Sequence, residues 1–132
     1  MMAEHPNVES TRASLEAFMK GDLETMAAGV RDDAVWRVPG TNRFAGTIEG
    51  KPAILGRFQA QAEAGIRVAI DEIHDIVGND DHVVALLRTS VQGPGGSASG
   101  NAVFVMHVSG GQLKELWISN DHQAEIDRVI GS

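Results

Sequence analysis

The last third of the chain predicts a β-hairpin that is apolar on both faces. Residues 102–108 read AVFVMHV, residues 113–121 read LKELWISND, and a Ser-Gly-Gly-Gln turn joins the two segments. Consecutive glycines favour such a turn because glycine adopts positive φ at little cost. A sheet that is apolar on both faces has to be covered twice, by helices of its own chain and by something else.

The register of this hairpin decides which side chains share a face. A turn centred on Gly110 and Gly111 predicts that His107 pairs with Lys114 and that Asn101 pairs with Asn120. One face then carries Asn101, Val103, Val105, His107, Lys114, Leu116, Ile118 and Asn120. The other face carries Ala102, Phe104, Met106, Glu115, Trp117, Ser119 and, at its end, Asp121.

The composition fits a single domain over residues 1–132. A chain of 132 residues buries about two-thirds of its unfolded surface. A formal charge of −7 argues against a nucleic-acid partner, which requires a basic surface. The absence of cysteine excludes disulfides, thiolate nucleophiles and thiolate metal ligands. With no long apolar run and a polar start, MMAEHPN, we expect a soluble cytoplasmic protein that does not enter a membrane.

Hydrophobic spacing and turn residues predict the order of the elements. We expect helices over residues 8–20, 23–30 and 51–64 and a last short helix over 122–130. Asn7 and Asp22 are the expected caps of the first two helices. Strands are expected over residues 34–38, 43–48, 66–77 and 82–91, followed by the hairpin. This order predicts an α+β fold in which helices cover one face of a curved sheet.

Short motifs along the chain point to a family. They are GD at 21–22, DDAVWRVPG at 32–40, AG at 45–46, GKPAI at 50–54 and HVSGGQLKELWISND at 107–121. Together they resemble the NTF2-like superfamily, and within it the SnoaL-like proteins related to polyketide cyclases and ketosteroid isomerases. The resemblance implies a cone-shaped, cystatin-like barrel, in which a curved, mostly antiparallel sheet wraps around a long helix with two shorter helices. It also implies a deep apolar pocket and a homodimer.

The ketosteroid isomerase site itself is not expected. Those enzymes use an aspartate base and an oxyanion hole made of a tyrosine and a protonated aspartate. On the resemblance, the tyrosine position falls on Ser14, the base position on Val38 and the oxyanion aspartate on Phe104 or Val105. The chain contains no tyrosine. We therefore do not expect steroid isomerisation by that set of residues.

The resemblance to polyketide cyclases points instead to Asp121, because their acid/base aspartate lies at the end of the last strand. In an apolar pocket, desolvation would raise the pKa of Asp121 and allow proton transfer near neutral pH. The alternative role for Asp121 is to cap the C-terminal helix. His107 is an auxiliary catalytic candidate, since histidine titrates near neutral pH. Its alternative is a histidine satisfied by its neighbours on the sheet.

The remaining candidate site residues are expected to bind a small hydrophobic molecule. Trp36 and Trp117 would wall a pocket for a flat ligand, although each also fits a core or a dimer interface. Paired amides at Asn101 and Asn120 would orient a polar ligand atom, or else hydrogen-bond at the sheet edge. The expected ligand-binding set is Trp36, Phe44, Phe58, Asn101, Val103, Trp117, Ile118 and Asn120.

We expect no cofactor and no metal. The five histidines show no ligand spacing, and Asn79-Asp80-Asp81 is a turn signal before it is a calcium loop. Arg88 interrupts an apolar strand, where it requires a carboxylate if buried and lies at an exposed strand end otherwise. The expected partners are the small hydrophobic molecule and a second copy, bound through the outer sheet face, without nucleic acid or membrane.

Three functions stay open on the sequence. The first is a cofactor-independent enzyme that acts on an apolar carbonyl or polyketide-like molecule by acid/base chemistry. The second is a binding protein that holds a small hydrophobic ligand without turning it over. The third is epoxide hydrolysis, which requires an Asp-Arg-Asp set of which Arg88 and Asp121 supply two members.

Overall fold

The computed structural model describes residues 4–131. Over these residues the helices are α1 (Pro6–Met19), α2 (Leu23–Ala28), α3 (Lys51–Glu63) and α4 (Gln123–Ile130). The strands are β1 (Val30–Val38), β2 (Gly46–Glu49), β3 (Arg67–Gly78), β4 (His82–Gly93), β5 (Gly96–Ser109) and β6 (Gln112–Asn120). None of these helices is long and apolar enough to span a membrane.

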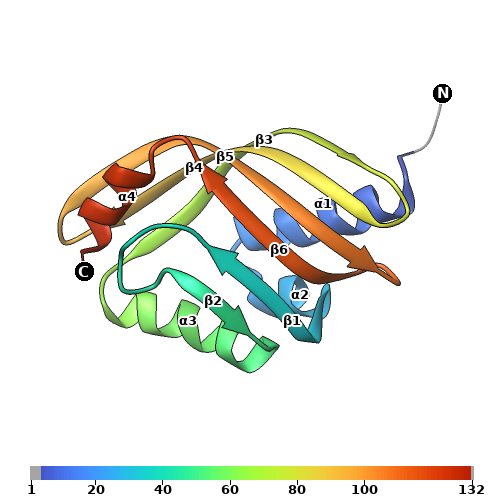
Figure 1. Cartoon of the computed structure of the whole chain (residues 1–132), viewed down its shortest axis with the longest axis horizontal. Coiled ribbons are helices and arrows are strands. Elements are labelled where there is room, and N and C mark those ends of the chain that lie inside the picture. Colours follow the sequence, from blue (N-terminus) through green and yellow to red (C-terminus); the bar gives the residue numbers. More distant parts are fainter. Residues whose placement is uncertain (1–3, 132) are drawn as a thin grey trace.

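The strands form one curved sheet in the order β2-β1-β6-β5-β4-β3 (Figure 1). All neighbours are antiparallel except β1 and β6, which run parallel. The sheet does not close, because its edge strands β2 and β3 do not pair with each other. Helix α1 packs on β3 and β4, α3 on β1 and β2, and α4 on β4 and β5. The predicted α+β fold with a helix-covered curved sheet is confirmed.

Local sequence signals explain where the helices begin. The Asp22 carboxylate accepts a hydrogen bond from the Thr25 backbone N–H at 3.1 Å, so Asp22 caps α2 as predicted. Helix α3 follows Gly50, whose φ of 91° favours glycine, and carries a proline in its first turn. The predicted cap at Asn7 is wrong. His5 caps α1, and the Asn7 side chain instead donates to the backbone of Asn79 at 3.0 Å.

The predicted register of the last hairpin is also wrong. Ser109 pairs with Gln112 and Val108 with Leu113, but His107 then pairs with Glu115. Lys114 is therefore the extra residue of a β-bulge, which shifts every later pair by one. Residues expected on one face are separated by the bulge. Leu116, Ile118 and Asn120 share the inner face with Phe104 and Met106, whereas Val103, Val105 and His107 share the outer face with Glu115, Trp117 and Ser119.

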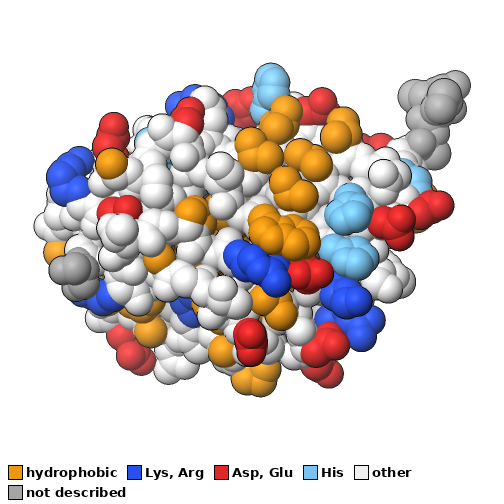
Figure 2. Space-filling model, viewed as in Figure 1, with side chains coloured by type: hydrophobic (Ala, Val, Ile, Leu, Met, Phe, Trp, Pro, Cys, Tyr) orange, Lys and Arg blue, Asp and Glu red, His pale blue; other side chains and the backbone are white. Residues whose placement is uncertain are grey.

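The inner face of the sheet carries most of the buried side chains. The main core lies between the sheet, α1 and α3, and includes Trp36, Ile54 and Val83. A smaller cluster beneath α4 is formed by Ile66, Val91, Ala98, Val129 and Ile130. On the outer face apolar side chains gather in the middle of the view, beside histidine side chains (Figure 2).

Candidate functional site

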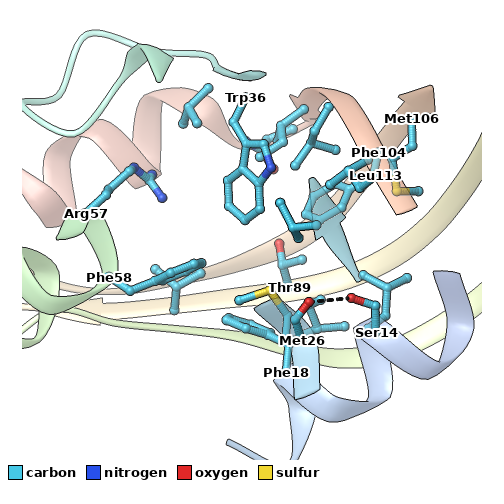
Figure 3. A pocket seen from close by; sticks show the side chains of 18 of the residues that line it. Ser14, Phe18, Met26, Trp36, Arg57, Phe58, Thr89, Phe104, Met106 and Leu113 are labelled. Carbon is cyan, nitrogen blue, oxygen red and sulfur yellow. Dashed lines mark hydrogen bonds between the residues drawn. The ribbon is translucent and has the colours of Figure 1, made fainter. Parts of the chain in front are cut away.

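A cavity of about 160 Å³ lies between the inner face of the sheet and the helices (Figure 3). An engineered apolar cavity of about 150 Å³ holds a molecule of benzene, so this space suits a ligand with about one ring inside it. Large apolar side chains form its walls: Phe18, Met26, Trp36, Phe58, Phe104, Met106, Leu116 and Ile118. Such walls bind ligands through burial of apolar surface.

Three aromatic rings run along one side of the cavity. The Trp36 ring meets the Phe58 ring edge-on, with 5.7 Å between centroids, and Phe58 lies 5.6 Å from Phe18. Trp36 comes from β1 and Phe58 from α3, so the contact joins the sheet to the covering helix. The indole Nε1 of Trp36 is buried and has no hydrogen-bond partner within residues 4–131. A buried indole N–H without a partner is an unusual, unfavourable arrangement unless a ligand or a bound water supplies the acceptor.

One end of the cavity is polar and is formed where β6 runs into α4. Asn120 donates to the Gln123 side chain at 2.8 Å, and Gln123 donates to the Asp127 carboxylate at 3.0 Å. Asn42 donates to the same carboxylate at 2.7 Å. Burial opposes ionisation of Asp127, but these hydrogen bonds outweigh it and lower its pKa. The amides at this end are therefore largely committed to the Asp127 carboxylate and to one another.

His122 is the exception at this polar end. Its Nδ1 lies 2.9 Å from Oδ1 of Asp121, whereas its Nε2 is buried without a partner among the residues that the structure describes. The His122 side chain lines the cavity and is 6% exposed. One nitrogen of this imidazole is therefore held in place while the other remains available.

Asp121 is fixed by the neighbouring strand. Its two carboxylate oxygens accept hydrogen bonds from the backbone N–H and the side-chain amide of Asn101, each at 2.9 Å. These bonds, the backbone one first, lower the pKa of Asp121. The expected rise in the pKa of Asp121 by desolvation is therefore wrong, because the carboxylate is 55% exposed and well supplied with donors. An ionised Asp121 accepts the Nδ1–H of His122 and leaves a lone pair on Nε2.

Gly100 has no side chain, and the Asp121–His122 pair occupies the space in which a side chain at this position would lie. A Cβ atom at Gly100 would lie 2.6 Å from Oδ1 of Asp121 and 2.7 Å from Cγ of His122. Both distances are shorter than any normal contact. Since φ of Gly100 is not in the left-handed region, room for the pair, and not backbone freedom, makes glycine necessary here.

Helix α3 adds Arg57 and Gln61 to the cavity lining. Arg57 Nε donates to the backbone carbonyl of Phe44 at 3.0 Å. Burial lowers the pKa of Arg57 to about 10. The Nε2 of Gln61 is buried without a partner, and the residue is 3% exposed.

The structure places the predicted site residues in different surroundings. Trp36, Phe58, Ile118 and Asn120 line the cavity. Phe44 packs instead against the small cluster beneath α4. The positions that correspond to the isomerase site, Ser14, Val38 and Phe104, also line the cavity. Ser14 donates to the Met26 carbonyl at 3.3 Å (Figure 3).

Other predicted residues lie on the outer face, because the bulge shifts the register. His107 stacks on His82 with 5.2 Å between ring centroids and lies 3.6 Å from Glu115. Trp117 packs beneath the Arg37 guanidinium at 5.1 Å, and Val103 pairs with Ser119 on the same face. The expectation that these side chains share a pocket with Ile118 is therefore wrong.

Two further predicted residues, Asn101 and Arg88, are exposed to solvent. Asn101 is exposed and holds Asp121 instead of pairing with Asn120. Arg88 is exposed, as one alternative predicted, but it lies in the middle of β4 and not at its end, and it donates to the Asn101 side chain at 3.1 Å. No aspartate or glutamate lines the cavity within residues 4–131, so the Asp-Arg-Asp set of an epoxide hydrolase does not form there. No cluster suited to a metal ion occurs in this range either.

Two cavity residues that were not predicted, His122 and Gln61, could have been found from simple periodicity. Leu116, Ile118 and Asn120 alternate onto the inner face, and the next residue in that series is His122. Gln61 lies seven residues after the buried Ile54 on α3, and therefore on the same helix face. Arg57 gave no such signal, because a long cationic side chain at a helix surface is normally solvated.

The curved open sheet, the covering helices and the cavity between them are those of the NTF2-like, or cystatin-like, fold. A protein of unknown function from Xanthomonas campestris with a cystatin-like fold has a TM-score of 0.89, with 23% identity over 96% of this chain and 98% of that one. TerC, co-crystallized with polyporic acid, has a TM-score of 0.78, with 22% identity over 96% and 100%. An LEH-like epoxide hydrolase of M. tuberculosis has a TM-score of 0.70, with 18% identity over 94% and 89%.

More specifically, the model of the SnoaL-like domain matches residues 11–116, and the chain belongs to the SnoaL-like family. An uncharacterized protein of Mycobacterium tuberculosis (strain ATCC 25618 / H37Rv) is 25% identical over 118 residues, which cover 87% of this chain and 88% of that one. The family resemblance inferred from the sequence motifs is thereby confirmed.

Proposed function

We propose that this SnoaL-like domain is an enzyme that moves a proton on an apolar carbonyl or polyketide-like molecule bound in the cavity, without a resident cofactor. One observation carries the proposal. His122 lines the cavity with a buried Nε2 that has no partner, while Asp121 holds its Nδ1 at 2.9 Å. A histidine held in this way by a carboxylate is the arrangement that general bases use.

His122 takes the role of the base in this proposal, and Asp121 becomes a positioning residue. The lowered pKa of Asp121 keeps its carboxylate ionised near neutral pH, where it cannot itself deliver a proton. An ionised carboxylate instead selects the Nδ1–H tautomer and stabilises the imidazolium that forms. His122 then removes a proton from the carbon beside a carbonyl and returns it after a double bond has moved or a ring has closed.

Removal of that proton leaves negative charge on the carbonyl oxygen, and the cavity offers a donor for it. Trp36 Nε1 is buried, unpartnered and lines the same space as His122. A fixed N–H donor in apolar surroundings stabilises a developing oxyanion. Trp36 would take the place of the tyrosine that the chain lacks.

Proton exchange tests this proposal without knowledge of the natural substrate. Cyclic ketones of one and two rings are incubated with the protein in D₂O, and loss of the proton beside the carbonyl is followed by NMR. We expect catalysed exchange that falls by about 10² or more in H122Q and D121N. The matched control is H107Q, since His107 also lies beside a carboxylate but on the outer face.

Melting temperatures of the same variants separate chemistry from folding. Unchanged exchange in H122Q, or equal losses in H122Q and H107Q, would contradict the assignment. A wild-type protein that binds the ketones without catalysing exchange would favour the binding-protein alternative.

We further propose that the outer face binds a second copy of the chain. Val77, Val84, Val105 and Trp117 form a row of cross-strand neighbours from β3 to β6. Val77 is 55% exposed, and the view in Figure 2 shows apolar side chains together on one face. A continuous apolar patch of this kind is typical of a protein interface. A homodimer would give the sheet the second cover that its composition requires.

A further inference from the structure

The cavity contains one cationic side chain and no carboxylate among the described residues. Arg57 projects from α3 toward the space between the rings of Trp36 and Phe58 (Figure 3). No carboxylate of residues 4–131 lies within salt-bridge distance of its guanidinium. Arg57 is partly buried, and cations that are withdrawn from water normally have an anionic partner.

The contacts of Arg57 hold it in place without using its outer end. Nε is fixed by the carbonyl of Phe44 at 3.0 Å, whereas neither Nη atom donates to a described residue. The two Nη atoms are the end of the guanidinium that binds the two oxygens of a carboxylate. Burial lowers the pKa of Arg57 to about 10, and no anionic neighbour counteracts that shift. An anionic ligand would restore the partner that the protein does not provide.

Gln61 extends this donor surface by one helical turn. Residues four apart on a helix lie side by side, so Gln61 and Arg57 present neighbouring side chains. The Nε2 of Gln61 is buried without a partner in a residue that is only 3% exposed. Leaving such a group unsatisfied is costly, which is why buried amides are nearly always hydrogen-bonded. Within residues 4–131 the buried Gln61 amide thus lacks an acceptor, and the partly exposed Nη end of Arg57 on the same helix face makes no hydrogen bond.

We infer that the ligand of this cavity is a cyclic or aromatic acid, whose carboxylate binds as an anion to Arg57 and Gln61 while its apolar ring lies against Trp36 and Phe58. The inference rests on the proposed function in taking this cavity as the substrate site. It adds that the carbonyl compound on which His122 acts also bears an acidic group. Substrates without that group would be held by apolar contact alone.

A matched pair of ligands tests the inference. Indane-2-carboxylate and indane-2-carboxamide have nearly the same shape and differ in charge, and their affinities are measured by isothermal titration calorimetry at pH 7.5. We expect the acid to bind the wild-type protein at least about tenfold more tightly than the amide. R57Q should reduce this ratio to about one, and R57K should retain part of it. Q61L should weaken acid binding by a smaller factor.

The control variant is R37Q, since Arg37 lies on the outer face and should leave the ratio unchanged. An acid that binds no better than the amide, or does not bind at all, would overturn the inference, as would an unchanged ratio in R57Q. The H122Q variant keeps the two proposals separate. It should retain the preference for the acid while losing proton exchange, so an Arg57-dependent preference without exchange would remove only the catalytic proposal.

Discussion

The two faces of the sheet differ in whether their polar side chains have hydrogen-bond or salt-bridge partners. On the outer face Glu115 accepts a hydrogen bond from Arg37 at 2.8 Å and lies 3.6 Å from His107, so each charge has a partner. On the inner face the polar atoms of Trp36 and His122 are buried without partners. Trp36 and Arg37 are adjacent on β1, yet within residues 4–131 the indole Nε1 of Trp36 has no partner whereas Arg37 is paired.

This difference indicates where function is located. A buried unpaired group destabilises the folded protein by about 1–3 kcal/mol, so it is expected where a ligand or a bound water completes it. The outer groups are already satisfied, and the hydrogen bond from Arg37 is the main reason that the pKa of Glu115 is lowered. The histidines show the contrast directly, because His107 and His122 each have a carboxylate neighbour and only His122 lines the cavity.

The largest expected effect is the loss of the proposed dimer interface on the outer face. Val105 lies in the middle of the apolar row, between Val84 and Trp117. V105D would bury an uncompensated charge between two copies, which abolishes association. Sedimentation at micromolar concentration should give twice the chain mass of 14.0 kDa for the wild type and the single mass for V105D. A wild-type protein that sediments as a monomer would contradict the dimer proposal.

The next largest effect is expected from a substitution at Gly100, next to the Asp121–His122 pair. An added Cβ collides with the Asp121–His122 pair and has to displace it, so we expect G100A to lose proton exchange by about 10². The collision should also lower the free energy of unfolding by about 1–3 kcal/mol, which thermal unfolding measures. The control is G56A, because Gly56 lies in α3 with open space around its Cβ position. That variant should keep its activity and gain up to about 1 kcal/mol.

The same valine-to-alanine substitution at two adjacent positions of β4 compares the stability that each face of the sheet contributes. Val83 is fully buried on the inner face, whereas Val84 lies on the outer face with intermediate exposure. V83A should lower the free energy of unfolding by about 2 kcal/mol, since it removes buried methyl groups and leaves a cavity. V84A should cost less than about 1 kcal/mol in urea unfolding at the same protein concentration. Equal losses would mean that the outer face is packed as tightly as the core.

The fold could be predicted from the sequence because its signals are local. Asp22 before a short helix, Gly50 before α3 with a proline in the first turn of that helix, and the Gly110–Gly111 turn each act within a few residues. The bulge at Lys114 could not be predicted in the same way. It depends on how β5 and β6 pack together, and a single extra residue exchanges the two faces of a strand.

The candidate site was predicted less well than the fold for the same reason. Asp121 was chosen for an expected burial that the structure does not give it, while its neighbour His122 has that burial. Only the position of Gly100 on the adjacent strand explains why the two side chains fit together. The burial of Arg57 depends on how α3 covers the open side of the sheet, and no local pattern encodes it.

The smallest expected effect concerns Arg57 on the inner side of the sheet. Its unpaired charge should lower the stability of the ligand-free protein. Burial holds the pKa of Arg57 at about 10, below its ordinary value, so the folded state binds this proton less tightly than the unfolded state does. The penalty is therefore fully present below pH 10 and fades as the pH rises above it. R57M removes the charge but also the hydrogen bond to Phe44, and we expect a net gain on the order of 1 kcal/mol at pH 8. Thermal unfolding should show a melting temperature a few degrees above the wild type, with a smaller difference at pH 11. Saturating indane-2-carboxylate should reverse the order, because only the wild type gains stability from binding the anion. A variant that is less stable than the wild type at pH 8 without ligand would show that Arg57 already has its partner, and that the inner face is as fully satisfied as the outer one.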